Sequence, residues 1–89
     1  QARAIRAERQ PLIDALQALS GVRKVWPSEA NMVLMRVDDA GKTQAAMKAR
    51  GVLVKNVSAM HPLLAQCLRL TVGTREENAQ MLAALKESL

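Results

Sequence analysis

Residues 67–78 read Cys-Leu-Arg-Leu-Thr-Val-Gly-Thr-Arg-Glu-Glu-Asn, and they predict a strand, a turn and a helix start. In a strand, successive side chains point to opposite faces. The two faces predicted here carry Leu68, Leu70 and Val72 on one side, and Cys67, Arg69 and Thr71 on the other. The stretch therefore predicts a strand over 67–72 that buries an aliphatic face and carries an arginine on the opposite face.

The same stretch predicts where the last helix begins. Gly73 and Thr74 turn the chain, and Thr74 followed by Glu77 forms a capping box, in which each side chain accepts a hydrogen bond from the other residue's backbone. The helix that follows is expected to bury one stripe of side chains. That stripe comprises Asn78, Met81, Leu82, Leu85 and Leu89.

Two more strands are predicted upstream. Residues 31–37 give the strongest strand signal, with apolar side chains on both faces, as a central strand requires. Residues 22–26 predict a shorter strand that Pro27 ends, and residues 27–30 predict a turn.

A helix lies between strands in the middle of the chain. A weak, Ala-rich helix over 42–50 can be capped by one of the two aspartates before it and closed by Gly51. Residues 52–55 then predict a short apolar strand, and residues 56–66 are the one long irregular stretch.

The chain opens with helical character. Apolar spacing predicts a regular helix over 11–19, after a charged helical lead over 1–10. Pro11 marks either a kink or the first helical turn, and Gly21 can supply a left-handed cap.

The predicted order is α-β-β-α-β-β-α, and the chain is long enough for one domain, residues 1–89. The fold class expected is α+β, a two-layer α/β sandwich with a small mixed or antiparallel sheet and helices packed on one face. Gln1 in place of a methionine indicates either that an initiator region was removed or that the chain is a piece of something longer.

Composition narrows the classes of function. The net charge is +5, but Trp26 is the only aromatic residue, and RNA-binding sheets need stacking aromatics, so no nucleic-acid partner is expected. The single cysteine, Cys67, excludes an intramolecular disulfide and a multi-cysteine zinc site, and no metal site is expected. A single thiol suits a reducing compartment, and no apolar run is long enough to span a membrane, so the cytoplasm is expected.

Five residues are candidates for a site. Arg69 in mid-strand is either a solvent-facing arginine or a fork for a carboxylate or phosphate. Lys55 is either solvated or lines a site at a strand end. His61 is expected at the surface, and Cys67 as a buried structural thiol. The Asn31 side chain is expected to brace a turn and not to act in catalysis.

Three motifs resemble the histidinol-phosphate aminotransferases. Residues 21–36 are similar to G-V-x-x-V-x-P-S-x-A-N-F-x-L-x-R, residues 50–55 to R-G-[IV]-L-V-R, and residues 67–78 to C-L-R-[IL]-T-V-G-T-x-E-E-N. Met32 stands where the family has phenylalanine, and Lys55 where it has arginine. Aromatic amino acid and other amino-acid aminotransferases share weaker versions of these motifs and stay open as alternatives.

The resemblance implies the carboxy-terminal small domain of a class I/II aminotransferase of histidine biosynthesis, with residues 1–10 leading from the large domain. It implies pyridoxal phosphate on that large domain, none bound to this chain, and no transaminase activity of this chain alone, because the Schiff-base lysine lies upstream. Arg69 would bind the substrate α-carboxylate, and Lys55 would lie near the substrate side chain or its phosphate. The implied partners are the large domain, a second subunit, an amino-acid substrate and 2-oxoglutarate or glutamate. A free-standing ferredoxin-like ligand-binding or regulatory module is the alternative.

Overall fold

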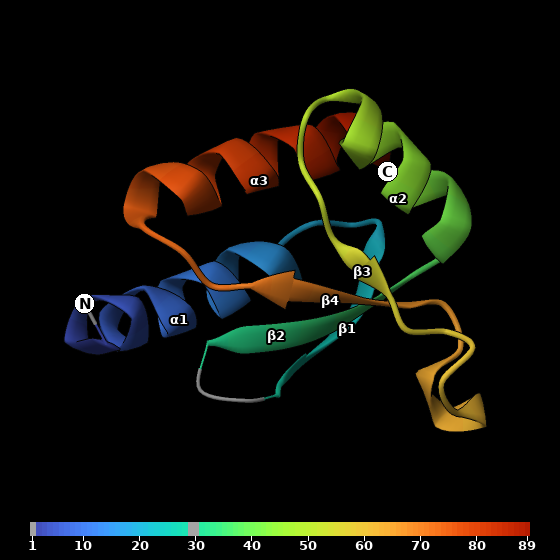
Figure 1. The fold of residues 1–89 in the computed structure, drawn as a ribbon, viewed down its shortest axis with the longest axis horizontal. Helices are drawn as coiled ribbons and strands as arrows, with labels where there is room; N and C mark the ends of the chain where they lie inside the picture. The colour runs from blue at the N-terminus through green and yellow to red at the C-terminus, as the bar shows by residue number, and fades with distance from the viewer. Residues whose placement is uncertain (1, 29–30) are drawn as a thin grey trace.

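The computed structural model describes residues 2–28 and 31–89. Its elements are α1 (Ala2–Gln17), β1 (Val22–Pro27), β2 (Met32–Val37), α2 (Ala40–Ala49), β3 (Lys55–Asn56), the 3-10 turn η1 (Pro62–Leu64), β4 (Cys67–Thr71) and α3 (Arg75–Ser88). Apart from η1, this is the predicted order α-β-β-α-β-β-α, and the α+β class is confirmed (Figure 1).

The four strands form one sheet in the order β1-β2-β4-β3, with every neighbouring pair antiparallel. The strand β4 comes last in the sequence, yet it lies between β2 and β3. The two strands joined through α2 are therefore parallel to one another and separated by β4. The expectation that residues 31–37 supply a central strand is also confirmed, because β2 lies between β1 and β4.

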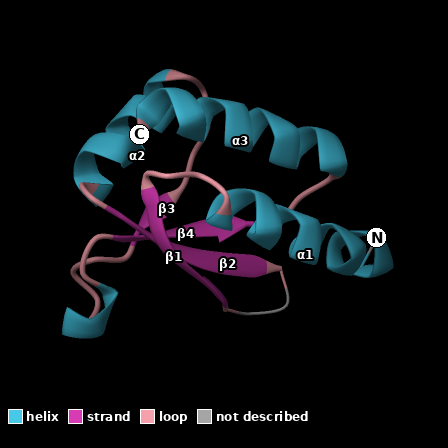
Figure 2. Ribbon diagram, turned by 180° about the vertical axis from the view of Figure 1, so that it is seen from behind, coloured by secondary structure: helices cyan, strands magenta, loops and turns pink. Residues whose placement is uncertain are grey.

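The helices cover one face of the sheet, as Figure 2 shows from behind. We call this the inner face. Side chains from α1, β2, β4 and α3 meet there in one apolar core, and its fully buried members include Leu16, Val33, Met35, Leu68, Leu70 and Leu85. The opposite, outer face carries Arg69 and Thr71 from β4, which are half-buried and exposed respectively. The predicted facing of the β4 side chains is therefore confirmed.

The first helix differs from the prediction. It is continuous from Ala2 to Gln17, so the charged lead and the regular helix are one element and Pro11 lies inside it. Proline removes one backbone donor there. Burial of Leu12, Ile13 and Leu16 on the core offsets that loss. The left-handed cap predicted at Gly21 is wrong, because the chain leaves the helix through turns closed by the N–H groups of Leu19 and Val22.

The strand predicted over 52–55 is reduced to β3, the pair Lys55–Asn56. The backbone before β3 is bonded to α2 instead of the sheet. The Val52 N–H donates to the Met47 carbonyl at 3.0 Å, and the Val54 carbonyl accepts from the Gln44 side chain at 3.0 Å. Gly51 closes α2 with φ of 83°, as expected, and Asp39 caps its start.

The capping box of α3 is confirmed, with Thr74 as the N-cap and Glu77 as its partner. The predicted stripe holds in part. Asn78 is buried, but its amide braces the preceding turn by bonding both the N–H and the carbonyl of Gly73. Leu89 is 44% exposed and is not part of the stripe. The turn predicted over 27–30 includes residues 29 and 30, which lie outside the described residues.

We expect Leu70→Ala to lower the free energy of unfolding of the chain by about 2–5 kcal/mol, because it removes buried methyl groups and leaves a cavity. Thr71→Ala, on the exposed face next to it, should change that free energy by less than about 0.5 kcal/mol. Urea unfolding of both variants measures the difference. Equal midpoints would contradict the facing of β4.

A second prediction concerns the stability of the fold at acidic pH. The Thr74 N–H donates to Glu77 Oε1 at 2.8 Å and holds the pKa of this carboxyl below its ordinary value. The bond therefore stabilises the fold above the pKa of the unfolded chain, and that contribution is lost as the pH falls through the lower folded pKa. Glutamine keeps the capping bond but does not titrate. The melting temperature of Glu77→Gln should therefore drop less than that of wild type between about pH 7 and about pH 3.

The matched control is Glu76→Gln, which removes the same charge from the first turn of α3 without touching the capping box. It should keep most of the acid sensitivity of the wild type. If both variants lose acid sensitivity equally, the cause is the charge of the helix start and not the capping bond.

Candidate outer-face anion site

One row of side chains crosses the outer face of the sheet. Trp26 of β1 is paired with Leu34 of β2, Leu34 with Arg69 of β4, and Arg69 with Lys55 of β3. Paired residues in antiparallel strands share a face, so the four side chains are neighbours in this order. Two residues singled out from the sequence, Arg69 and Lys55, are thus brought side by side by strand pairing.

Arg69 is half-buried in the middle of this face. Among the described side chains, those of residues 7–28 and 31–89, the one ion pair is between Arg23 and Asp38, and no hydrogen bond joins the Arg69 guanidinium to another residue. A half-buried guanidinium without a partner has lost hydration that nothing in the described protein replaces. Its planar fork suits a carboxylate or phosphate that accepts two parallel hydrogen bonds.

Lys55 is exposed, and its backbone is fixed from both sides. The residue before it, Val54, is held to α2 through the Gln44 amide, and beyond Asn56 the Val57 N–H donates to the Cys67 carbonyl at 3.1 Å. Lys55 and Arg69 therefore form a pair of adjacent cations on a defined backbone. Two such cations with no carboxylate between them favour an anion with more than one oxygen.

A hollow of about 480 Å³ lies at the other end of the row. It is lined by Trp26, Pro27, Leu34, Arg36, Leu63 and Leu64. The Arg36 guanidinium carbon and the Lys24 ammonium lie 5.0 and 5.1 Å from the centre of the Trp26 ring, within the range of cation–π attraction. Arg36 was not among the candidates from the sequence, although alternation along β2 puts it on the same face as Leu34.

The other sequence candidates lie outside this row. His61 is exposed and caps η1 by accepting from the Leu63 N–H through Nδ1, so the expected surface histidine is confirmed. Cys67 is fully buried, as expected of a structural thiol. Asn31 is exposed, and its backbone carbonyl accepts from the Val72 N–H at 2.7 Å. Whether its side chain braces the 27–30 turn stays a prediction.

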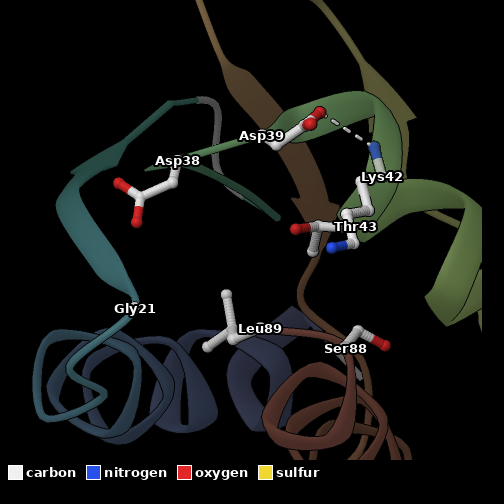
Figure 3. A pocket seen from close by; sticks show the side chains of 7 residues that line it. All are labelled: Gly21, Asp38, Asp39, Lys42, Thr43, Ser88 and Leu89. Atoms are coloured by element: carbon white, nitrogen blue, oxygen red, sulfur yellow. Dashed lines mark hydrogen bonds between the residues drawn. The ribbon is translucent and has the colours of Figure 1, made fainter.

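A second hollow, of about 180 Å³, is shown in Figure 3 between the start of β1, the start of α2 and the end of α3. Asp38 and Asp39 are among its lining residues, but Asp39 is engaged in capping α2 and Asp38 in a two-bond pair with Arg23. That pair lowers the pKa of Asp38 through the hydrogen bond from Arg23.

No group of His, Cys, Asp and Glu that could hold a metal ion occurs in the described part of the chain. None of the helices in residues 2–28 and 31–89 combines the length and the apolar character needed to cross a membrane.

Residues 1–85 match the family described as aminotransferase class I and II, and the chain belongs to this family. Within it, the chain is 63% identical over 89 residues to the histidinol-phosphate aminotransferase of Paracidovorax citrulli. The match covers 100% of this chain but 24% of that protein, so the chain spans about a quarter of the length of this curated relative.

Solved structures agree on the fold. The histidinol-phosphate aminotransferase of Clostridium acetobutylicum matches with a TM-score of 0.87 at 22% identity, over 96% of this chain and 26% of that one. A decarboxylase from Sulfurospirillum multivorans matches with a TM-score of 0.80 at 28% identity, over 91% of this chain and 24% of that one. Proteins named for two different reactions thus share this architecture, and the fold alone does not select the chemistry.

The adjacent cations Lys55 and Arg69 are expected to lower the free energy of unfolding of the chain. Like charges directly opposite one another in a sheet repel, so Lys55→Gln should raise the free energy of unfolding of the chain at low salt by about 0.2–1 kcal/mol. The gain should shrink as salt screens the pair. Urea unfolding at two salt concentrations measures both effects.

The control for this prediction is Lys86→Gln, which removes the same charge from the last turn of α3. A cation is favourable there, so this variant should be no more stable than wild type. A Lys55→Gln variant less stable than wild type at low salt would show that Lys55 and Arg69 are not near neighbours.

Proposed function

We propose that this chain is the carboxy-terminal small domain of a pyridoxal-phosphate-dependent aminotransferase that acts on histidinol phosphate in histidine biosynthesis. The proposal is supported by membership of the class I and II family and by the 63% identity to a histidinol-phosphate aminotransferase. The structural observation that carries it is Arg69, which lies unpaired on the outer face of the sheet among the described residues. The activity belongs to the full-length protein, and the chain by itself is proposed to be inactive.

Arg69 is proposed to bind the carboxylate or equivalent anionic end of the substrate. Its fork can donate two parallel hydrogen bonds and so fix both the position and the orientation of that group. A substrate held in this way presents its reacting carbon in one direction, which contributes to the rate as well as to binding. The half-buried setting strengthens the interaction, because less water competes for the guanidinium.

Lys55 is proposed to contact the substrate side chain or its phosphate. Its pairing with Arg69 across β3 and β4 brings a second cation to the same anion-binding area. An ammonium group acts as a point charge and can follow a phosphate that moves. Arg69 is thus proposed to orient the anion with its planar fork, and Lys55 to add a charge on a flexible side chain.

The cofactor is proposed to bind elsewhere in the full-length protein. The described outer face offers cations suited to an anionic substrate, and the lysine that would hold the cofactor is proposed to lie in the large domain. Pyridoxal phosphate supplies the electron sink for amino-group transfer when it is bound. The remaining proposed partners are that large domain, a second subunit and 2-oxoglutarate or glutamate, and the proposed compartment is the cytoplasm. The free-standing ferredoxin-like module is not favoured, given the family match over residues 1–85.

The test is Arg69→Lys in the full-length protein. An ammonium cannot reproduce the fork, so we expect kcat/KM for histidinol phosphate to fall at least about 100-fold, equivalent to about 2.7 kcal/mol of transition-state stabilisation. The melting temperature should change little, because Arg69 lies outside the core. Steady-state kinetics and a thermal melt on the same variant measure the two effects.

Arg23→Lys is the matched control, since it makes the same exchange in the same sheet at an exposed ion pair. It should keep wild-type kinetics. If Arg69→Lys keeps activity within a few-fold, the substrate anion is bound elsewhere. If activity and melting temperature collapse together, Arg69 has a structural role.

A further inference from the structure

We propose that Arg36 is a positioning residue for the anion site: it anchors the 57–66 connection, and through that connection it fixes Lys55 and β3 relative to Arg69. This inference rests on the proposed function, because it assigns Arg36 a part in substrate binding. Arg36 acts from β2, on the far side of β4 from Lys55.

Two of the three guanidinium nitrogens of Arg36 are hydrogen-bonded within the protein. Its Nε donates to the Ala65 carbonyl at 3.0 Å, and its Nη2 donates to the Leu63 carbonyl at 2.6 Å. The guanidinium also lies over Trp26, with 5.0 Å between its carbon and the ring centre. Two hydrogen bonds from one rigid fork fix the carbonyls of η1 and its C-cap in direction as well as distance. Arg36 therefore differs from Arg69, which keeps its donors free for a ligand.

The segment that Arg36 holds joins the two strands of the cation pair. It leaves β3 after Asn56 and enters β4 at Cys67. The strand β3 has two paired residues and lies at the edge of the sheet, and the bonds beside this pairing that hold it are the Gln44–Val54 bond before it and the Val57–Cys67 bond after it. Figure 1 shows η1 projecting away from the helices, below the sheet in that view. Without the Arg36 anchor, motion of this exposed connection would load the few bonds that hold β3 and loosen the strand.

The end of the connection is held in an unfavourable backbone conformation. Gln66 has φ of 58°, in the left-handed region that a residue with a side chain enters at a cost. Two contacts keep it there: its carbonyl accepts from the Val37 N–H at 3.0 Å, and its Oε1 accepts from the Ala40 N–H at 2.7 Å. A conformation maintained at a cost by surrounding contacts is the pattern found where geometry is under functional constraint. Arg36 and Gln66 thus fix the same connection at adjacent points before β4.

The test uses the full-length protein with Arg36→Met, which keeps an unbranched apolar side chain that can contact Trp26 but loses the guanidinium and both hydrogen bonds. Backbone hydrogen exchange in residues 57–66 should become about tenfold faster, with other strands unchanged. The KM for histidinol phosphate should rise about tenfold while kcat stays within about threefold, because Arg69 is intact but its partner strand is loosened. Arg36→Lys keeps the charge and one donor group, so its exchange rate and its KM should lie between those of wild type and Arg36→Met.

Arg23→Met is the control, since it removes an arginine of the same sheet that bonds to Asp38 and does not touch the connection. It should leave exchange in 57–66 and both kinetic constants as in wild type. Unchanged exchange in Arg36→Met overturns the anchoring role, and faster exchange with unchanged KM overturns the positioning role. If Arg36→Met does not fold, Arg36→Lys decides by the same two readouts. A wild-type protein without transaminase activity would overturn the proposed function, and the positioning role with it. The hydrogen-exchange measurement on residues 57–66 would still decide whether Arg36 anchors the connection.

Discussion

The burial of Leu68 and Leu70 in the apolar core fixes β4 in the middle of the sheet, and the other features of the molecule depend on this packing. Because side chains alternate along a strand, the burial of these two leucines forces Arg69 onto the opposite face. The pairing of β4 with β3 then puts Lys55 beside it. The hydrophobic core therefore determines the position of the proposed anion site without contributing an atom to it.

Much of the fold could be inferred from the sequence because its signals are local. The alternation in residues 67–72, the capping box at Thr74 and the glycine after α2 each act within a few residues. The errors arose where a contact distant in sequence, or packing on the core, overrode the local pattern. Burial of the following turns carries α1 through Pro11, and the Gln44 side chain takes the backbone carbonyl that a longer β3 would have used.

In the candidate site, too, local sequence signals could be recognised and contacts distant in sequence could not. Arg69 interrupts an apolar strand and could be recognised by that pattern alone, whereas its neighbours could not. Lys55 becomes adjacent only through the register of β3 and β4, and Arg36 reaches carbonyls that are 27 and 29 positions away in the sequence. No periodicity encodes such contacts, so the candidate residues could be named individually while their arrangement required the structure.

The insertion of β4 between β2 and β3 also determines when the sheet can form during translation. The ribosome makes β1, β2, α2 and β3 first, and the strand that joins β3 to the rest emerges after them. Until residues 67–71 leave the exit tunnel, one side of β2 is an open edge and β3 has no partner. An open edge of this kind can pair with another nascent chain. A ribosome that pauses when β3 has left the exit tunnel and residues 67–71 are still inside it would therefore hold the chain in an aggregation-prone state.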